Sequence, residues 1–158
     1  MSRKTLIKTY TRRDILKAGT ASAIAINFLP SRVFGANERI TMAGIGVGGK
    51  GGSDISGAGE VGEVIALCDC DFNRGGGAAK KWPKAKKFTD FREMLDKMGK
   101  DIDACTASTP DHTHAPAAIR AMNQGIHVYC QKPLTHTVWE ARQMRLVAEK
   151  NEVCTQMG

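Results

Sequence analysis

Short apolar runs alternate along the chain with longer segments in which apolar residues recur at helical spacing. Apolar runs of about four to eight residues are typical of buried strands. The pattern predicts six strands, near residues 40–43, 61–68, 86–88, 102–107, 126–130 and 153–157. Since a helical segment separates most strands from the next, we expect the strands to be parallel.

The intervening segments predict helices with recognisable ends. Apolar residues at helical spacing mark a helix over 91–98, for which Thr89 or Asp90 is the expected N-cap. A further helix is expected over 115–123, ending before a glycine. The last helix is expected to run from its N-cap at Thr137 to residue 150.

This repetition of strand and helix predicts an α/β fold, a doubly wound parallel sheet of the Rossmann type with helices on both faces. Ligands bind such sheets at the carboxyl ends of the strands. Three strand-end segments are therefore expected to meet at one edge, namely the glycine cluster 44–52, residues 108–114 and residues 131–133.

The glycine cluster contains a dinucleotide-binding fingerprint. Gly44, Gly46 and Gly49 follow the first strand with the spacing G-x-G-x-x-G, and Asp69 ends the second strand about 20 residues further on. We expect Gly44 to adopt a positive φ in the turn and Gly46 to let the backbone approach a pyrophosphate. Gly49 is expected to let the helix pack closely on the strand.

The same loop carries the expected cofactor chemistry. Amides in the first turn of a helix have no partner within the helix, so they are available to phosphate. The Asp69 carboxylate can accept both ribose hydroxyls, which favours NAD, while Arg74 leaves NADP open. Each glycine costs a helix about 1 kcal/mol relative to alanine. The helix start near 48–52 is thus expected to fray unless a ligand or packing holds it, and glycines 75–77 predict a short or irregular helix. The alternative is a glycine-rich loop without a ligand.

Positive charge is concentrated at the N-terminus. The 158-residue chain has a formal net charge of +7, but residues 1–36 hold seven Lys and Arg residues against Asp14 alone. The remaining residues carry 16 basic and 15 acidic side chains, which removes the main electrostatic argument for nucleic-acid binding. The five cysteines match no zinc spacing, and we expect them to be buried free thiols.

Residues 1–36 are predicted to be a targeting segment, which leaves 37–158 as the dinucleotide-binding domain. Residues 11–17 (TRRDILK) resemble the twin-arginine export signal, and the apolar stretch 18–29 is too short for a stable membrane span. The predicted location is the periplasm or cell envelope. The alternative is a basic amphipathic helix.

Four segments, taken in order, resemble the Gfo/Idh/MocA oxidoreductase family. They are 43–49 (AGIGVGG), 66–69 (ALCD), 109–114 (TPDHTH) and 132–134 (KPL). The resemblance covers about residues 38–158 and implies hydride transfer between a nicotinamide cofactor and a hydroxyl of a sugar or polyol. It also implies that Lys132 is the catalytic residue, which orients the substrate oxygen and helps to manage its proton.

The fingerprint and the resemblance together imply one cofactor-binding set: Gly44, Ile45, Gly46, Val47, Gly48, Gly49, Asp69, Ser108, Thr109, Pro110, His114, Lys132 and Pro133. The chain has Gln131 where the family more often has glutamate, and an amide cannot tune Lys132 as a carboxylate would. The alternative for Lys132 is a solvated loop lysine, and for His114 a surface or capping residue. His112 and His114 lack a third metal ligand at suitable spacing, so we expect no metal.

Members of this family continue after the last strand into a second α/β domain that binds substrate and builds the oligomer. The resemblance therefore implies that the C-terminal substrate domain is absent here and that these residues alone are inactive. The alternative is a non-catalytic nucleotide-binding module or partner subunit. The sequence encoded after Gly158 would distinguish the two interpretations. The present sequence leaves the oligomeric state open.

Overall fold

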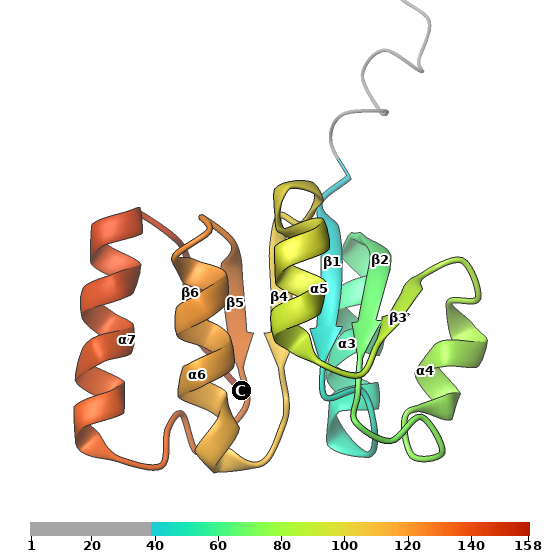
Figure 1. Cartoon of the computed structure of the whole chain (residues 1–158), viewed down its shortest axis with the longest axis horizontal. Coiled ribbons are helices and arrows are strands. Elements are labelled where there is room, and N and C mark those ends of the chain that lie inside the picture. Colours follow the sequence, from blue (N-terminus) through green and yellow to red (C-terminus); the bar gives the residue numbers. More distant parts are fainter. Residues whose placement is uncertain (1–38) are drawn as a thin grey trace, which may run out of the picture. The chain divides into compact units, whose positions relative to one another are not determined.

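The computed structural model describes residues 39–158, and the predicted export signal lies outside them. Six strands form one parallel sheet in the order β3-β2-β1-β4-β5-β6 (Figure 1). The elements in chain order are β1 (Thr41–Ile45), α3 (Lys50–Val61), β2 (Glu63–Cys68), α4 (Gly76–Lys81), β3 (Lys86–Phe88), α5 (Phe91–Met98), the 3-10 turn η1 (Gly99–Asp101), β4 (Ala104–Ala107), α6 (Asp111–Met122), β5 (His127–Cys130), α7 (Val138–Asn151) and β6 (Thr155–Met157). The predicted doubly wound α/β sheet is confirmed.

The order of the strands places a crevice beside β1. The chain moves from β1 outward to β2 and β3, then crosses back to β4 and continues in the opposite direction to β6. Right-handed crossovers consequently put the helices of the two halves on opposite faces. The register pairs Ile45 with Cys68 on one side and with Ala107 on the other, so three strand ends lie level at the point where the direction reverses. Ligands bind at this point in sheets of this kind.

Each face of the sheet has its own core. One core contains buried residues of α5, α6 and α7, including Met94, Leu95, Met122 and Met144. The other, smaller core packs α3 and α4 on the opposite face around the fully buried Ile55. Figure 1 shows α5, α6 and α7 in front of the sheet and α3 behind it. The two cores anchor the helices whose N-terminal ends meet at the carboxyl edge.

Several predicted elements agree closely with the structure. Helix α5 and strand β3 have the predicted bounds, and the Asp90 side chain caps α5 by accepting from the Arg92 amide at 2.8 Å. Thr137 and Glu140 form a capping box at the start of α7, which fixes its first turn. Helix α4 is only six residues long, as the glycines predicted.

Several boundaries differ from the prediction, mostly by one or two residues. Helix α6 begins at Asp111, four residues earlier than expected, because Pro110 at its N-cap supplies a φ of −57° that leads into the helix. His112 and His114 therefore lie in a helix rather than a loop. Val61, predicted to begin the second strand, is instead the last residue of α3 and is 73% exposed. Strand β2 begins at Glu63. Strand β1 runs on through Gly44 to Ile45, inside the fingerprint.

The cysteine prediction was partly wrong. All five cysteines lie within the described residues and are free thiols, but only Cys68, Cys105 and Cys130 are buried, whereas Cys70 and Cys154 are exposed. Burial raises the pKa of Cys68 and of Cys105 to about 12 and that of Cys130 to about 11. The two exposed thiols follow or precede their strands instead of lying within them. Among residues 39–158, no helix is long and apolar enough to cross a lipid bilayer.

Candidate functional site at the carboxyl edge of the sheet

The turn that leaves β1 depends on a left-handed glycine. Gly46 has a φ of +75°, and a Cβ placed there would lie 2.8 Å from the carbonyl oxygen of Ser108. Its amide donates to the Cys68 carbonyl at 2.8 Å, and the Ser108 amide donates to the Ile45 carbonyl at 2.9 Å, so the turn is joined to both neighbouring strand ends. The positive φ predicted for Gly44 was wrong, because Gly44 still belongs to β1. In this loop the residues with positive φ are Gly46 and Gly49.

The start of α3 is held by packing against this turn. Gly51 is buried, and a Cβ there would collide with the Gly46 carbonyl, so no larger residue fits. The close-packing role expected of Gly49 therefore belongs to Gly51, since a Cβ on Gly49 would meet nothing within 4 Å. Ile55, one turn further along, is fully buried in the core. Tertiary packing thus supplies the support that a glycine-rich helix start lacks.

The Asp69 carboxylate is bound to the glycine loop itself. Its Oδ2 accepts from the amides of Val47 at 2.8 Å and Gly48 at 3.0 Å, while Oδ1 accepts from the Asp71 amide at 2.9 Å. Three backbone donors therefore fix the carboxylate at the tip of β2. The carboxylate is thereby held beside the uncapped start of α3, where a ribose and a phosphate could be bound side by side.

A cavity of about 620 Å³ opens at this point. It brings together residues from the ends of β1, β2, β3 and β4: Gly46, Gly48, Gly49, Lys50, Cys68, Asp69, Cys70, Asp71, Arg74, Thr89, Phe91, Ser108, Thr109, Pro110, His112 and Thr113. The predicted residues Gly44, Ile45, Val47, His114, Lys132 and Pro133 are not part of this lining. Sequence reasoning missed Phe91 and Thr89 in this lining, because their apolar spacing and capping position explained them fully as helix residues.

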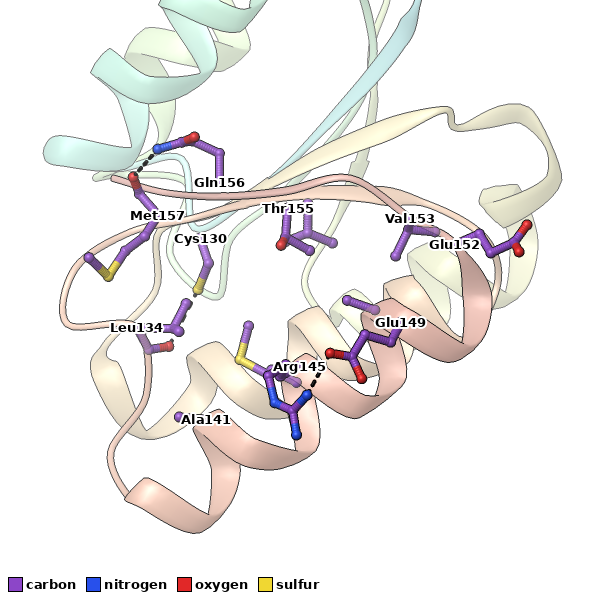
Figure 2. A pocket seen from close by; sticks show the side chains of 13 residues that line it. Cys130, Leu134, Ala141, Arg145, Glu149, Glu152, Val153, Thr155, Gln156 and Met157 are labelled. Carbon is purple, nitrogen blue, oxygen red and sulfur yellow. Dashed lines mark hydrogen bonds and ion pairs between the residues drawn. The ribbon is translucent and has the colours of Figure 1, made fainter.

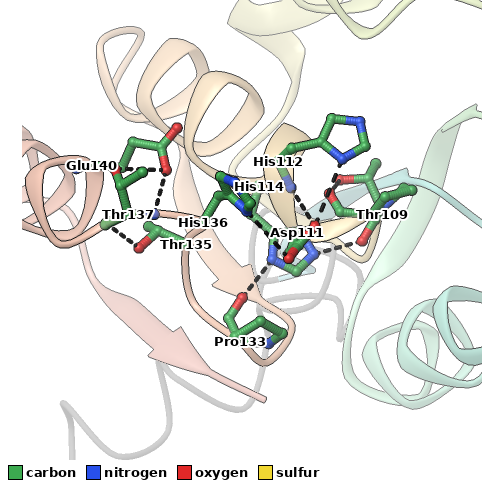
Figure 3. A network of polar contacts seen from close by, with 10 residues as sticks. Thr109, Asp111, His112, His114, Pro133, Thr135, His136, Thr137 and Glu140 are labelled. Atoms are coloured by element: carbon green, nitrogen blue, oxygen red, sulfur yellow. Dashed lines mark hydrogen bonds and ion pairs between the residues drawn. The ribbon is translucent and has the colours of Figure 1, made fainter.

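His114 is a buried clamp between two loops. Its side chain is 1% exposed, and Figure 3 shows the ring between Thr109 and Pro133. Nδ1 lies 2.7 Å from the Pro133 carbonyl oxygen and Nε2 lies 2.6 Å from that of Thr109. Both carbonyls only accept, and a neutral imidazole can donate to one of them. His114 thus joins the segment after β4 to the segment after β5.

A second polar group lies on the surface next to this clamp. The Asp111 carboxylate accepts from the amide of His112 at 2.8 Å, and its other oxygen lies 3.5 Å from Nδ1 of His136 (Figure 3). These contacts, the His112 amide first, lower the pKa of Asp111 below its ordinary value. Within residues 39–158, no three His, Cys, Asp or Glu side chains are arranged to hold a metal ion.

The segment after β5 carries Lys132, whose side chain is exposed to solvent. The Lys132 amide donates to Oε1 of Gln131 at 2.8 Å, and Nε2 of Gln131 donates to Oδ2 of Asp54 at 2.9 Å. Gln131 is buried, and its side-chain amide is hydrogen-bonded through both its nitrogen and its oxygen. Asp54 is a residue that the sequence did not single out, because nothing in its position on α3 links it to β5.

Two further hollows lie away from this edge. One, of about 510 Å³, lies between α7 and strands β5 and β6; its walls include Leu134, Met144 and Val153, and Arg145 pairs with Glu149 on α7 at 2.5 Å (Figure 2). The other, of about 630 Å³, lies beside α3 over β4, β5 and β6. Neither contains the glycine loop or Asp69.

Comparison with known proteins gives a consistent result. Residues 39–158 match the sequence profile of GFO_IDH_MocA, described as an oxidoreductase family with an NAD-binding Rossmann fold. Inositol 2-dehydrogenase from Rubrobacter xylanophilus is 30% identical over 117 residues, which cover 70% of this chain and 32% of that protein. Levoglucosan dehydrogenase from Pseudarthrobacter phenanthrenivorans is 36% identical over 77 residues, or 48% of this chain and 19% of that protein.

Solved structures have the same fold. An NAD-binding oxidoreductase from Klebsiella pneumoniae superposes with a TM-score of 0.65 at 27% identity, covering 76% of this chain and 34% of that one. The WlbA dehydrogenase from Bordetella pertussis, in complex with NADH and UDP-GlcNAcA, superposes with a TM-score of 0.66 at 21% identity, covering 77% and 35%. The chain thus spans about a third or less of the length of these relatives.

Proposed function

Because this chain belongs to the Gfo/Idh/MocA family of oxidoreductases and is its NAD-binding Rossmann domain, we propose that it binds NAD in the cavity beside Gly46 and Asp69. The observation that carries the proposal is the Asp69 carboxylate, which the amides of Val47 and Gly48 hold beside the start of α3 in one cavity. The carboxylate is an acceptor for ribose hydroxyls. The start of α3 at Gly49 and Lys50 has no side-chain cap, so its first amides are donors of the kind that bind a pyrophosphate.

The preference for NAD over NADP follows from charge. A 2′-phosphate would stand against the Asp69 carboxylate, which three backbone hydrogen bonds hold in place. Like charges at close range are unfavourable when neither can move away. Arg74 also lines the cavity, but its side chain is exposed and free to remain in solvent.

We infer that the whole oxidoreductase acts on a hydroxyl of a sugar or polyol. The support is the pair of relatives named inositol 2-dehydrogenase and levoglucosan dehydrogenase. The bound nicotinamide would accept or supply the hydride. Lys132, with its exposed ammonium group at the same edge, would bind the substrate oxygen and assist transfer of its proton. His114 holds the carbonyl of the next residue, Pro133, and so positions the lysine.

Calorimetric titration of the purified chain with NAD, NADH and NADPH tests the cofactor proposal. We expect binding of NAD and NADH, weaker binding of NADPH, and at least a tenfold loss of NADH affinity in Asp69→Ala (~1.4 kcal/mol or more). Asp96→Asn is the matched control, because Asp96 pairs only with Arg120 on the surface far from the cavity lining. Equal affinity of the Asp69 variant and the wild type would contradict the proposed site.

We also propose export by the twin-arginine route. The support is the sequence TRRDILK at residues 11–17, followed by a short apolar stretch. The variant Arg12→Lys, Arg13→Lys keeps the charge but removes the arginine pair. We expect it to remain in the cytoplasm while the wild type is exported; unchanged fractionation between cytoplasm and periplasm would refute the proposal.

A further inference from the structure

Asp54 is a buried carboxylate at the centre of the carboxyl edge. It lies in the first turns of α3, and its side chain is 3% exposed. Oδ1 is paired with Lys50 of the same helix. Oδ2 accepts from Oγ of Ser108 at 2.7 Å and from Nε2 of Gln131 at 2.9 Å. A single carboxylate therefore joins the segments that follow β1, β4 and β5.

The contact with Gln131 leads directly to Lys132. Gln131 uses its amide nitrogen toward Asp54 and its carbonyl oxygen toward the backbone amide of Lys132. Gln131 is itself buried, at 7% exposure, so both bonds are shielded from water. The backbone of Lys132 is thus tied, through one side chain, to the helix that begins at the glycine loop.

This arrangement gives a reason for glutamine at position 131. With glutamate there, as in the Glu-Lys-Pro sequence more usual in the family, two carboxylates would face each other across the 2.9 Å now spanned by a hydrogen bond. Two carboxylates at such a distance cannot both ionise, so one would hold a proton. The amide removes this conflict because it donates to Asp54 without a proton from solvent. In this protein the one carboxylate of the pair is Asp54 on α3, and the residue after β5 supplies the amide.

We propose that Asp54 is a positioning residue that, with Gln131 as its matched partner, holds the Lys132 segment in register with the glycine loop. The proposal rests on the function proposed above for Lys132 and deepens it. It makes the distance between the dinucleotide cradle and the lysine depend on one carboxylate–amide pair. Exchanging the two groups preserves the carboxylate–amide pair, whereas Asp54→Asn alone leaves a weaker pair of two amides and Gln131→Glu alone sets two carboxylates against each other.

The charge at Asp54 is stable at neutral pH. Burial opposes its ionisation, but hydrogen bonds from Lys50, Gln131 and Ser108 outweigh burial and lower the pKa of Asp54 below its ordinary value. The charged or titratable groups near this pair are Lys50 on α3 and Tyr129 on β5, which interacts with Lys50. A lowered pKa means that the stability due to Asp54 is present at neutral pH and is lost only as the pH falls through that pKa.

The test compares the full chain with Asp54→Asn, Gln131→Glu and the double variant that exchanges the two groups. Asp96→Asn and Gln124→Glu, both at exposed positions, are the matched controls for the same chemical changes. The first measurement is the urea unfolding midpoint at pH 5 and pH 8. The second is hydrogen exchange of the Lys132 amide relative to that of His127, whose amide bonds Asp103 at the opposite end of β5. The third is NADH affinity at pH 8.

We expect Gln131→Glu to raise the unfolding equilibrium constant at least tenfold at pH 8 and to recover part of this loss at pH 5, since about one pKa unit of repulsion corresponds to tenfold. In both single variants the Lys132 amide should exchange at least about fivefold faster relative to His127, because its acceptor at residue 131 is held less firmly. Asp54→Asn replaces the charged partner of Gln131 by a neutral amide, and Gln131→Glu is repelled by Asp54. The double variant should restore both values to near those of the wild type.

Two results would overturn the proposal: a Gln131→Glu variant as stable at pH 8 as at pH 5, or a double variant in which Lys132 exchanges as fast as in Asp54→Asn. A general loss of stability cannot imitate the effect, because it would accelerate His127 as well. The NADH titration is independent of these readouts. Failure of the wild type to bind NADH would refute the proposed function, whereas restored exchange in the double variant would still establish the pair.

Discussion

The two halves of the carboxyl edge are built in different ways. On the β1–β2 side, the glycine loop and Asp69 are held by backbone groups close to the carboxylate: the amides of Val47, Gly48 and Asp71. On the β4–β5 side, the Lys132 segment is held by side chains from distant parts of the chain, namely His114 on α6 and Asp54 on α3. The dinucleotide cradle is therefore a property of the loop backbone, whereas the position of the lysine depends on tertiary contacts.

This difference predicts how substitutions in each half change cofactor binding and the position of Lys132. Substitutions on the β1–β2 side should abolish binding by changing the backbone path, and the loss should be large. Substitutions on the β4–β5 side should leave the cradle intact and displace Lys132, and their effects should be smaller and open to rescue by a complementary change.

The largest effect is expected from Gly46→Ala. An alanine in the left-handed region costs about 1–2 kcal/mol, and its Cβ would also meet the Ser108 carbonyl at 2.8 Å. We expect a loss of unfolding free energy of about 2 kcal/mol or more and NADH binding too weak to measure by calorimetry. Gly76→Ala in α4, where a Cβ meets nothing within 4 Å, is the control and should be neutral or stabilising. Normal NADH binding by Gly46→Ala would contradict the described turn.

The next effect is expected from His114→Leu. Leucine fills the space but removes the imidazole N–H that donates to one of the Thr109 and Pro133 carbonyls, and an unpaired buried carbonyl typically costs about 1–3 kcal/mol. Urea unfolding should show a loss in this range, while NADH affinity should fall less than in Asp69→Ala. His112→Leu, at an exposed position, should change stability by less than about 0.5 kcal/mol. Equal losses in the two variants would show that the clamp does not hold the segment.

A smaller effect is expected on acidification. Hydrogen bonds from Arg92 lower the pKa of Asp90 to about 2, and hydrogen bonds from Thr41 lower that of Asp103. Carboxylates with lowered pKa values stabilise the folded state above their unfolded pKa of about 4, and this contribution is lost as the pH falls toward the folded values. Urea midpoints should thus decrease between pH 4 and pH 2. Asp103→Asn should reduce this decrease, and an unchanged pH profile in that variant would refute the role of the Thr41 contacts.

The smallest effect is expected at the cysteines. Under native conditions Cys70 and Cys154 should react rapidly with Ellman's reagent, and all five thiols should react after denaturation, because the other three are buried with raised pKa values. Cys70→Ser at the cavity rim should change unfolding free energy by less than about 0.5 kcal/mol. Rapid reaction of more than two thiols in the native chain would show that the core opens easily.

Local pattern was sufficient for much of this protein. The alternation of apolar runs predicted all six strands, and capping residues such as Asp90 and Thr137 predicted where helices begin. The glycine cluster, Asp69 and the segment 108–114 were predicted at one sheet edge and border a cavity there, whereas the predicted segment 131–133 does not line it. These predictions succeeded because periodicity, capping and glycine conformations are properties of neighbouring residues.

Other features were decided only by the tertiary structure. The burial of His114 depends on Pro133, 19 residues further along the chain. The close packing of Gly51 in place of Gly49 depends on the folded path of the turn after β1. The bond between Asp54 and Gln131 joins residues 77 positions apart. Sequence spacing along the chain determined which strands form and their approximate positions, but it contains no information on which side chains meet across a folded sheet. That is set by the order of the strands and the packing of helices on both faces.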